Sequence, residues 1–261
     1  MRQQFQRYVA IGDSSTEGLN DPDGAGGYCG WADRLALRIA RAQGALLYAN
    51  LAIRGRRTRR IREEQLAPAL AMRPELATLF SGTNDVVARH FDLDQVAEDV
   101  EQMQRALIAV GATVLTFTLP DLTPVMPLGR LASARITALN RALREISSRT
   151  GARLIDFAAH PVASDRRLWS ADRLHANAAG HDRIAHALAH ALELPGADAS
   201  WSRPLPQQSS PTALERWRAE ADWLRAYLLP WIWRHLRGRS SGDGVTAKRP
   251  QLRPVETGPT S

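Results

Sequence analysis

Residues 8–15 read YVAIGDSS, and the rest of the chain is organised around this stretch. A short apolar run rich in strand-forming residues ends at Gly12, and an acid and a serine follow it. The pattern predicts a buried strand that ends in a sharp turn and presents Ser14 at its carboxyl edge. Ligands bind at this edge in open α/β sheets. Ser14 is therefore either a nucleophile, if a base can reach it, or only a cap of the helix that follows.

Apolar runs of strand length alternate with segments of helical spacing up to residue 192. Further strands are predicted at residues 46–50, 76–80, 113–119 and 153–157, and helices at 31–42, 92–110, 128–149 and 178–192. This alternation is typical of a five-stranded parallel sheet covered by helices on both faces. Right-handed crossovers bring the loops after the strands to one edge. Ser14, Gly55, Asn84 and His175 are therefore predicted on the same side of the molecule.

The composition limits the class of protein. The 261 residues include one cysteine, so no internal disulfide is expected and the fold depends on its core. The formal net charge of +7 comes almost wholly from arginine, because Lys248 is the only lysine. We find no apolar leader segment and no uninterrupted apolar run long enough to span a bilayer. A cytoplasmic protein is therefore predicted, with peripheral membrane contact as the alternative discussed below.

Arginines are concentrated after the second predicted strand. The cluster consists of Arg54, Arg56, Arg57, Arg59, Arg60 and Arg62. Such a cluster either attracts an anionic substrate, such as a phospholipid or an acyl-CoA, or forms a solvated helix face. Nucleic acid is not expected as a partner, because no aromatic residues are interleaved here for base stacking.

The composition changes after residue 195 and divides the chain. Residues 1–195 are predicted to form the α/β domain, and residues 196–211 a linker rich in Ser, Pro and Gln. Residues 212–237 have helical periodicity and are rich in Trp and Arg. Residues 238–261 are dominated by Gly, Ser, Pro and Arg, and this tail is predicted to be disordered. The apolar stripe of the helical extension is Leu214, Trp217, Ala221, Leu224, Leu228 and Trp231.

Two interpretations of this amphipathic extension stay open. Its apolar stripe can pack on the α/β domain or on a second copy of the chain, which would make a homo-oligomer. It can instead lie on a membrane surface, where Trp and Arg suit the interface.

A second polar motif precedes the last predicted helix of the domain. Asp172 stands three residues before His175, so its carboxylate can fold back onto the imidazole. It would then keep one ring nitrogen protonated and leave the other free to accept a proton from a serine. Taken alone, the pattern is a weak signal, because helix entries often carry such residues as caps.

Two further strand ends carry groups that can donate to an oxyanion. Asn84 offers a neutral amide with two N–H bonds, and Gly55 offers a backbone N–H that a ligand can approach closely. Both residues are also ordinary turn residues.

Four blocks together resemble those of the SGNH (GDSL) hydrolase family. They are Gly-Asp-Ser at residues 12–14, Gly55, Gly-Thr-Asn-Asp at 82–85 and Asp-x-x-His at 172–175, in the family's order. The resemblance covers roughly residues 8–192. It implies a flavodoxin-like three-layer α/β/α domain and esterase or acylhydrolase activity that needs no metal and no cofactor.

The resemblance also implies roles for individual residues. Ser14 resembles the nucleophile, His175 the general base and Asp172 the residue that orients it. Gly55 and Asn84 resemble two oxyanion-hole donors, completed by the backbone N–H of Ser14. The implied function is a serine esterase that cleaves the carboxylic ester of a small molecule or lipid through an acyl-enzyme. The alternative is a non-catalytic peripheral membrane or scaffold protein that uses the hydrolase fold as a binding module.

Overall fold

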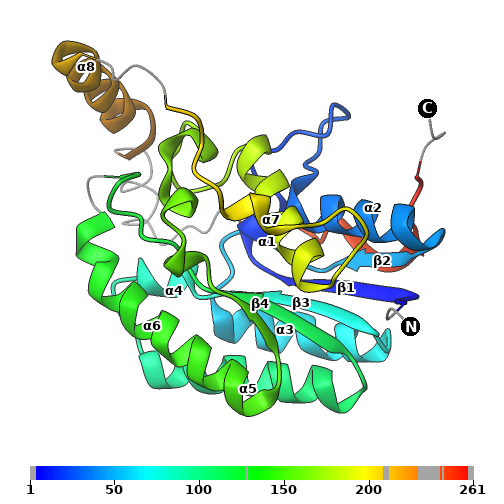
Figure 1. Ribbon diagram of the computed structural model, residues 1–261. Coiled ribbons are helices and arrows are strands. Elements are labelled where there is room, and N and C mark those ends of the chain that lie inside the picture. Colours follow the sequence, from blue (N-terminus) through cyan, green and yellow to red (C-terminus); the bar gives the residue numbers. More distant parts are fainter. Residues whose placement is uncertain (1–3, 127–128, 208–211, 229–241, 243, 258–261) are drawn as a thin grey trace.

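The core of the molecule is a six-stranded sheet of order β5-β4-β3-β1-β2-β6 (Figure 1). The computed structural model describes residues 4–126, 129–207, 212–228, 242 and 244–257. The strands are β1 Arg7–Gly12, β2 Leu47–Asn50, β3 Leu76–Phe80, β4 Thr113–Phe117, β5 Arg153–Ile155 and β6 Arg249–Pro254. Strands β1 to β5 are parallel to one another, and β6 is antiparallel to β2.

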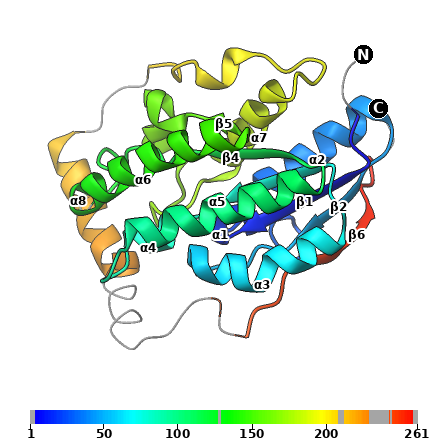
Figure 2. The ribbon, with the colours of Figure 1, turned by 90° about the horizontal axis from the view of Figure 1, so that it is seen from below.

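Helices cover both faces of this sheet, which confirms the predicted three-layer α/β/α architecture. The helices of the domain are α1 Ser14–Glu17, α2 Gly30–Gln43, α3 Thr58–Ala71, α4 Thr83–Val86, α5 Leu93–Ala109, α6 Gly129–Thr150 and α7 Ala178–Ala191. Helices α2 and α7 pack together on one face, and α5 packs between α3 and α6 on the other (Figure 2).

Burial explains why the strands are continuously apolar rather than alternating. All five residues of β3 are buried, as expected for a parallel strand with helices on both sides. On α5, the buried Val96, Val100, Met103 and Leu107 recur at helical spacing and face the sheet. Asp92 begins this helix by accepting a hydrogen bond from the Gln95 N–H at 3.1 Å.

The sixth strand corrects two predictions, the five-stranded sheet and the disordered tail. Residues 249–254, within the predicted tail 238–261, pair with the edge strand β2. Arg249 donates to the Tyr48 carbonyl at 2.8 Å, and its guanidinium lies 5.4 Å from the centre of the Tyr48 ring. Lys248 forms an ion pair with Asp33 at 2.9 Å. These contacts are with distant residues, so the tail's own composition does not predict them.

The predicted linker is in part attached to the domain. Within residues 196–211, Ala199–Ser202 form a short 3₁₀ helix beside α7. Arg183 donates to the carbonyls of Trp201 and Arg203, each at 2.7 Å, and the Trp201 indole donates to His190 at 3.2 Å. The chain is thus fixed to α7 for several residues before it leaves the domain.

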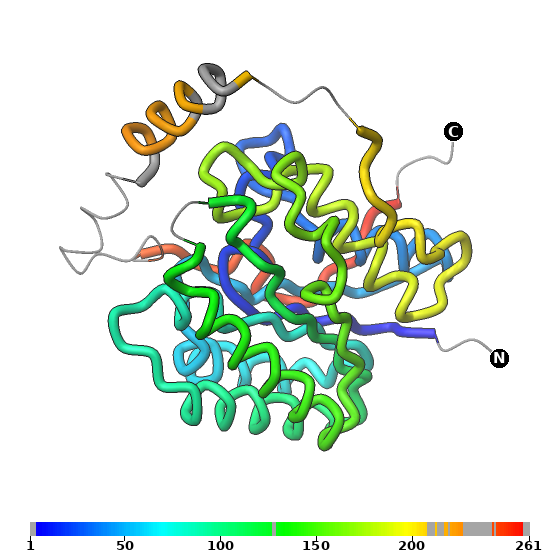
Figure 3. Tube along the Cα trace, turned by 60° about the vertical axis from the view of Figure 1, so that its left-hand side comes forward, coloured from blue at the N-terminus to red at the C-terminus, as the bar shows by residue number. Residues whose placement is uncertain are grey.

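Helix α8, Ala213–Trp223, lies within the predicted extension 212–237 at the periphery of the molecule (Figure 3), and its Trp223 belongs to the buried apolar core. A π-helical turn, Leu224–Leu228, follows it, and residues 229–237 lie outside the described residues. Two residues of the predicted apolar stripe are exposed, Trp217 at 69% and Leu224 at 41%. Among the described side chains of this segment, Trp223 is buried, and the predicted stripe does not include it.

The structure therefore leaves the membrane or second-subunit contact of the extension as a prediction. In the described part of the chain, no helix combines the length and the hydropathy that crossing a bilayer requires.

Candidate active site

Ser14 stands at the carboxyl end of β1, where the strand turns abruptly into α1. Gly12 permits this turn, because a Cβ there would lie 2.6 Å from the Phe80 carbonyl oxygen. The Gln65 side chain fixes the end of the strand by accepting from the Gly12 N–H at 2.8 Å and donating to its carbonyl at 2.9 Å. Asp13 caps α1 through the Ser15 N–H. These side-chain hydrogen bonds to the backbone hold Ser14 at the edge of the sheet.

The structure brings the three predicted residues Ser14, His175 and Asp172 into one hydrogen-bonded chain. The Nε2 atom of His175 lies 2.8 Å from the Oγ of Ser14. The Nδ1 atom of the same ring lies 2.7 Å from Oδ2 of Asp172. If Nδ1 carries the ring proton and donates it to Asp172, Nε2 is free to accept from Ser14. The arrangement can thus draw a proton from the serine hydroxyl.

The Asp172 carboxylate is surrounded by donors. Besides His175, it accepts from the Ser170 hydroxyl at 2.6 Å, the Asn20 amide at 2.7 Å and the N–H groups of Leu174 and His175 at 2.9 and 3.1 Å. Burial alone would raise the pKa of Asp172, but the hydrogen bonds and the nearby His175 ring hold it well below its ordinary value. Asp172 is therefore ionised at neutral pH and able to fix the ring of His175.

Asn20 is a site residue that sequence reasoning missed. Its backbone is left-handed, with φ of 68°, a conformation that asparagine adopts more readily than most residues. This turn aims the amide at both Ser170, at 2.9 Å, and Asp172. The Asn-Asp-Pro sequence predicts a turn. It does not predict that the Asn20 side chain contacts Ser170, which lies 150 positions away.

Two of the predicted oxyanion donors, Gly55 and Asn84, lie on loops that are connected to the Ser14 segment through neighbouring residues. Gly55 lies in a left-handed turn with φ of 75°. Within the described residues, neither its N–H nor that of Ser14 donates a hydrogen bond. The Asn84 amide nitrogen donates to Asp13 at 3.2 Å and to the Arg56 carbonyl at 3.0 Å. Asn84 thus links the segments that hold the other two donors, but its own N–H groups are both engaged.

Two buried acids, Asp13 and Asp85, are the sequence neighbours of Ser14 and Asn84. Asp13 is 1% exposed, and burial raises its pKa to about 7. Asp85 accepts from the Thr58 N–H at 3.0 Å and its hydroxyl at 2.7 Å, while burial raises its pKa too. A partly protonated Asp13 at neutral pH weakens the negative charge next to the serine.

The arginine cluster at residues 54–62 is largely neutralised by acids, which favours a salt-bridged helix face over an anion-binding surface. Five of the six arginines of the cluster form ion pairs, namely Arg54–Glu17, Arg56–Glu64, Arg59–Glu63, Arg60–Glu64 and Arg62–Asp99. Within the described ranges, no three His, Cys, Asp or Glu side chains are grouped as they would be around a metal ion.

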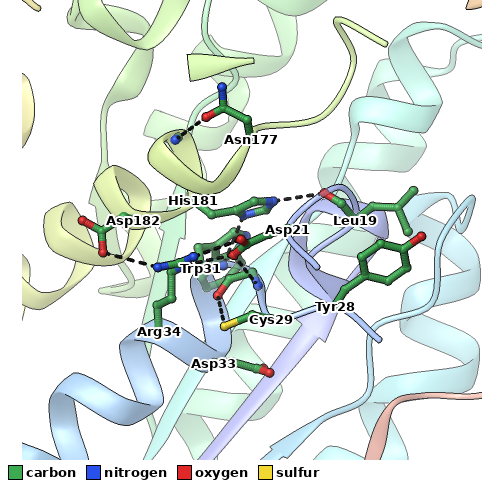
Figure 4. A network of polar contacts seen from close by, with 12 residues as sticks. Leu19, Asp21, Tyr28, Cys29, Trp31, Asp33, Arg34, Asn177, His181 and Asp182 are labelled. Carbon is green, nitrogen blue, oxygen red and sulfur yellow. Dashed lines mark hydrogen bonds and ion pairs between the residues drawn. The ribbon is translucent and has the colours of Figure 1, made fainter. Parts of the chain in front are cut away.

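A buried histidine on α7 fixes the loop between α1 and α2 (Figure 4). Nδ1 of His181 accepts from the Trp31 N–H at 3.1 Å, and Nε2 lies 3.2 Å from the Leu19 carbonyl. In the same network, Asp21 pairs with Arg34 at 2.8 Å. Burial lowers the pKa of His181 to about 4. The ring is therefore neutral at physiological pH, with its proton on Nε2.

His181 predicts how stability depends on pH. The unfolded side chain titrates near 6.5 and the folded one near 4, so its contribution is complete above pH 6.5 and is lost as pH falls towards 4. We expect a loss of about 3 kcal/mol from this group across that window. Urea unfolding of the wild type and of His181→Gln, which keeps a donor and an acceptor but does not titrate, measures it. An equal pH dependence in both proteins would contradict the prediction.

We compared the chain with models of known protein families. Residues 10–183 match the model of the GDSL-like lipase/acylhydrolase family. The chain belongs to this family. Membership supports hydrolysis of a carboxylic ester and agrees with the resemblance found in the four sequence blocks. A comparison with curated protein sequences returned no match.

Solved structures of GDSL-type and related esterases share the fold. The psychrotrophic esterase EstA from Pseudoalteromonas sp. is 17% identical, with a TM-score of 0.59 over 72% of this chain and 97% of its own. A catalytic mutant of Axe2, an acetylxylan esterase from Geobacillus stearothermophilus, is 19% identical, with a TM-score of 0.60 over 78% and 99%. The lipase/acylhydrolase from Enterococcus faecalis is 21% identical, with a TM-score of 0.56 over 78% and 100%.

Proposed function

We propose that the chain is a serine esterase or acylhydrolase that cleaves carboxylic esters through an acyl-enzyme. The observation that carries the proposal is the continuous hydrogen-bonded chain from Ser14 through His175 to Asp172, at 2.8 and 2.7 Å. A nucleophile, a base and a group that orients the base are the parts that acyl transfer by serine requires.

The first half of the proposed reaction forms the acyl-enzyme. Nε2 of His175 takes the proton of Ser14 while Oγ attacks the ester carbonyl carbon. The N–H groups of Ser14 and Gly55, with the Asn84 amide, stabilise the oxyanion of the tetrahedral intermediate. For this, Asn84 exchanges one of its present acceptors for the oxyanion. The intermediate then collapses, the alcohol leaves with the proton from His175, and the acyl group stays on Ser14.

The second half releases the acid. His175 takes a proton from a water molecule, and the resulting hydroxide attacks the acyl-enzyme carbonyl. The second tetrahedral intermediate uses the same donors. When it collapses, the carboxylic acid leaves and His175 returns the proton to Ser14. Throughout, the ionised Asp172 stabilises the imidazolium that forms twice in each cycle.

Small-molecule or lipid esters are the proposed substrates, and a panel of p-nitrophenyl esters of graded chain length tests the proposal. We expect the full-length chain to hydrolyse at least one of them with a kcat of about 1–10³ s⁻¹, the usual range for enzymes. Addition of a chelator should leave the rate unchanged, because no step uses a metal. A folded chain that turned over none of these esters would contradict the proposal and favour the non-catalytic binding module.

A further inference from the structure

Helix α8 contacts the loop that holds Asp172 and His175, although α8 lies outside the residues matched to the family. The Trp223 indole N–H donates to the backbone carbonyl of Asp172 at 3.2 Å. The Glu220 carboxylate pairs with Arg173 at 2.7 Å and with Arg166 at 3.0 Å. Glu220 and Trp223 are three positions apart, so both project from the face of α8 that meets the loop. Glu220 and Trp223 therefore make the contact between α8 and the loop.

Arg173 connects this helix to the site. It lies between Asp172 and His175 in sequence, and its backbone is left-handed, with φ of 59°. This turn lets the N–H groups of Leu174 and His175 both point at the Asp172 carboxylate. A left-handed conformation costs a non-glycine residue free energy and persists only where surrounding contacts maintain it. The position of the orienting acid thus depends on what holds Arg173.

Helix α8 is one of the elements that hold the Arg173 side chain in place. The Arg173 side chain is only 2% exposed, and its guanidinium lies 4.4 Å from the centre of the Trp223 ring. A buried cation needs a charged partner and a polarisable face, and Glu220 and Trp223 supply them. The hydrogen bond from Arg173 also holds the pKa of Glu220 below its ordinary value, so the partner is ionised. Trp223 is itself 4% exposed, which makes the contact mutual.

We propose that α8 is a positioning element of the active site, in which Glu220 and Trp223 act through Arg173 to hold His175 against Ser14. The inference rests on the proposed function and deepens it, because it assigns a role in that reaction to a segment outside the hydrolase domain. Neither residue of α8 touches the reacting atoms. The expected effect is therefore on kcat, through the geometry of His175, with KM nearly unchanged.

The test compares substitutions on the two faces of α8 in the full-length chain. Trp223→Ala removes the ring and the N–H, Trp223→Phe keeps a ring over Arg173, and Trp217→Ala is the matched control on the exposed face. We expect Trp223→Ala to lower kcat for p-nitrophenyl acetate by about 10- to 100-fold, the scale of a small misplacement of catalytic groups. Trp223→Phe should recover most of this loss. Trp217→Ala should stay within about twofold of the wild type, the scale of a substitution that leaves the geometry intact.

Hydrogen–deuterium exchange of peptides covering residues 170–177 provides a readout that needs no activity. Trp223→Ala should speed exchange in this loop, whereas Trp217→Ala should not. Unchanged exchange in Trp223→Ala overturns the inference, and so does faster exchange with an unchanged kcat. If the wild type hydrolyses no ester, the proposed function fails by itself, and the exchange result alone decides whether α8 holds the loop.

Discussion

Replacing Ser14 by alanine should lower kcat/KM for p-nitrophenyl acetate by about four to six orders of magnitude. The hydroxyl lost in this variant is the atom that lies 2.8 Å from Nε2 of His175 and that forms the acyl-enzyme in the proposed reaction. His175→Ala should cost a similar factor, because a serine without a base stays a neutral, weak nucleophile. Initial rates measured at saturating and limiting ester concentrations give both constants.

Ser15 provides a matched control for this loss. It is the adjacent residue on α1, and its hydroxyl lies 3.4 Å from the indole nitrogen of Trp31 rather than near His175. Ser15→Ala should therefore keep most of the activity, while circular dichroism shows both variants to be folded. A Ser14→Ala protein whose rate stays within about tenfold of the wild type would contradict the assignment of the nucleophile.

Asp172→Asn should cause the next largest loss of activity after Ser14→Ala and His175→Ala. The carboxylate now accepts the Nδ1–H of His175 at 2.7 Å, whereas an asparagine amide can donate to Nδ1 instead. The ring would then carry its proton on Nε2 and could no longer accept from Ser14. We expect kcat to fall by about 10³- to 10⁴-fold with little change in the overall structure.

Ser170→Ala separates this tautomer effect from a simple loss of one hydrogen bond. Ser170 donates to Asp172 at 2.6 Å, but its removal leaves the carboxylate and its other donors in place. Its kcat should fall by less than about tenfold, as for one hydrogen bond among several. If Asp172→Asn lost no more activity than Ser170→Ala, Asp172 would not control the protonation of His175.

Local patterns predicted the strand ends well, and with them the positions of Ser14, Gly55, Asn84 and the Asp172–His175 loop. This worked because parallel strands bring their carboxyl ends to one edge of the sheet. Residues that follow different strands are therefore expected to lie close together, even when they are far apart in the sequence. The patterns did not predict how the Asn84 amide is engaged. Its two acceptors lie on other loops, and the sequence around residue 84 contains nothing about them.

The C-terminal region shows the same limit more clearly. Apolar spacing selected the face of Trp217 and Leu224, which are exposed, whereas Trp223 is buried and packs on the Arg173 cation as well as on the apolar core. Similarly, β6 forms because an edge strand accepts backbone hydrogen bonds from almost any extended segment, prolines at its ends included. The periodicity of a segment does not show which distant residues that segment contacts, such as Arg173 for Trp223 and β2 for β6.

The most direct test of the central claim, that Ser14 is a nucleophile activated by His175, is the location of a fluorophosphonate adduct. Trypsin should release the adduct on the peptide from Tyr8 to Arg34, and fragmentation then distinguishes Ser14 from Ser15. We expect one adduct per chain, on Ser14, that forms far more slowly in His175→Ala. An adduct on another residue, or none on an enzyme that hydrolyses esters, would contradict it.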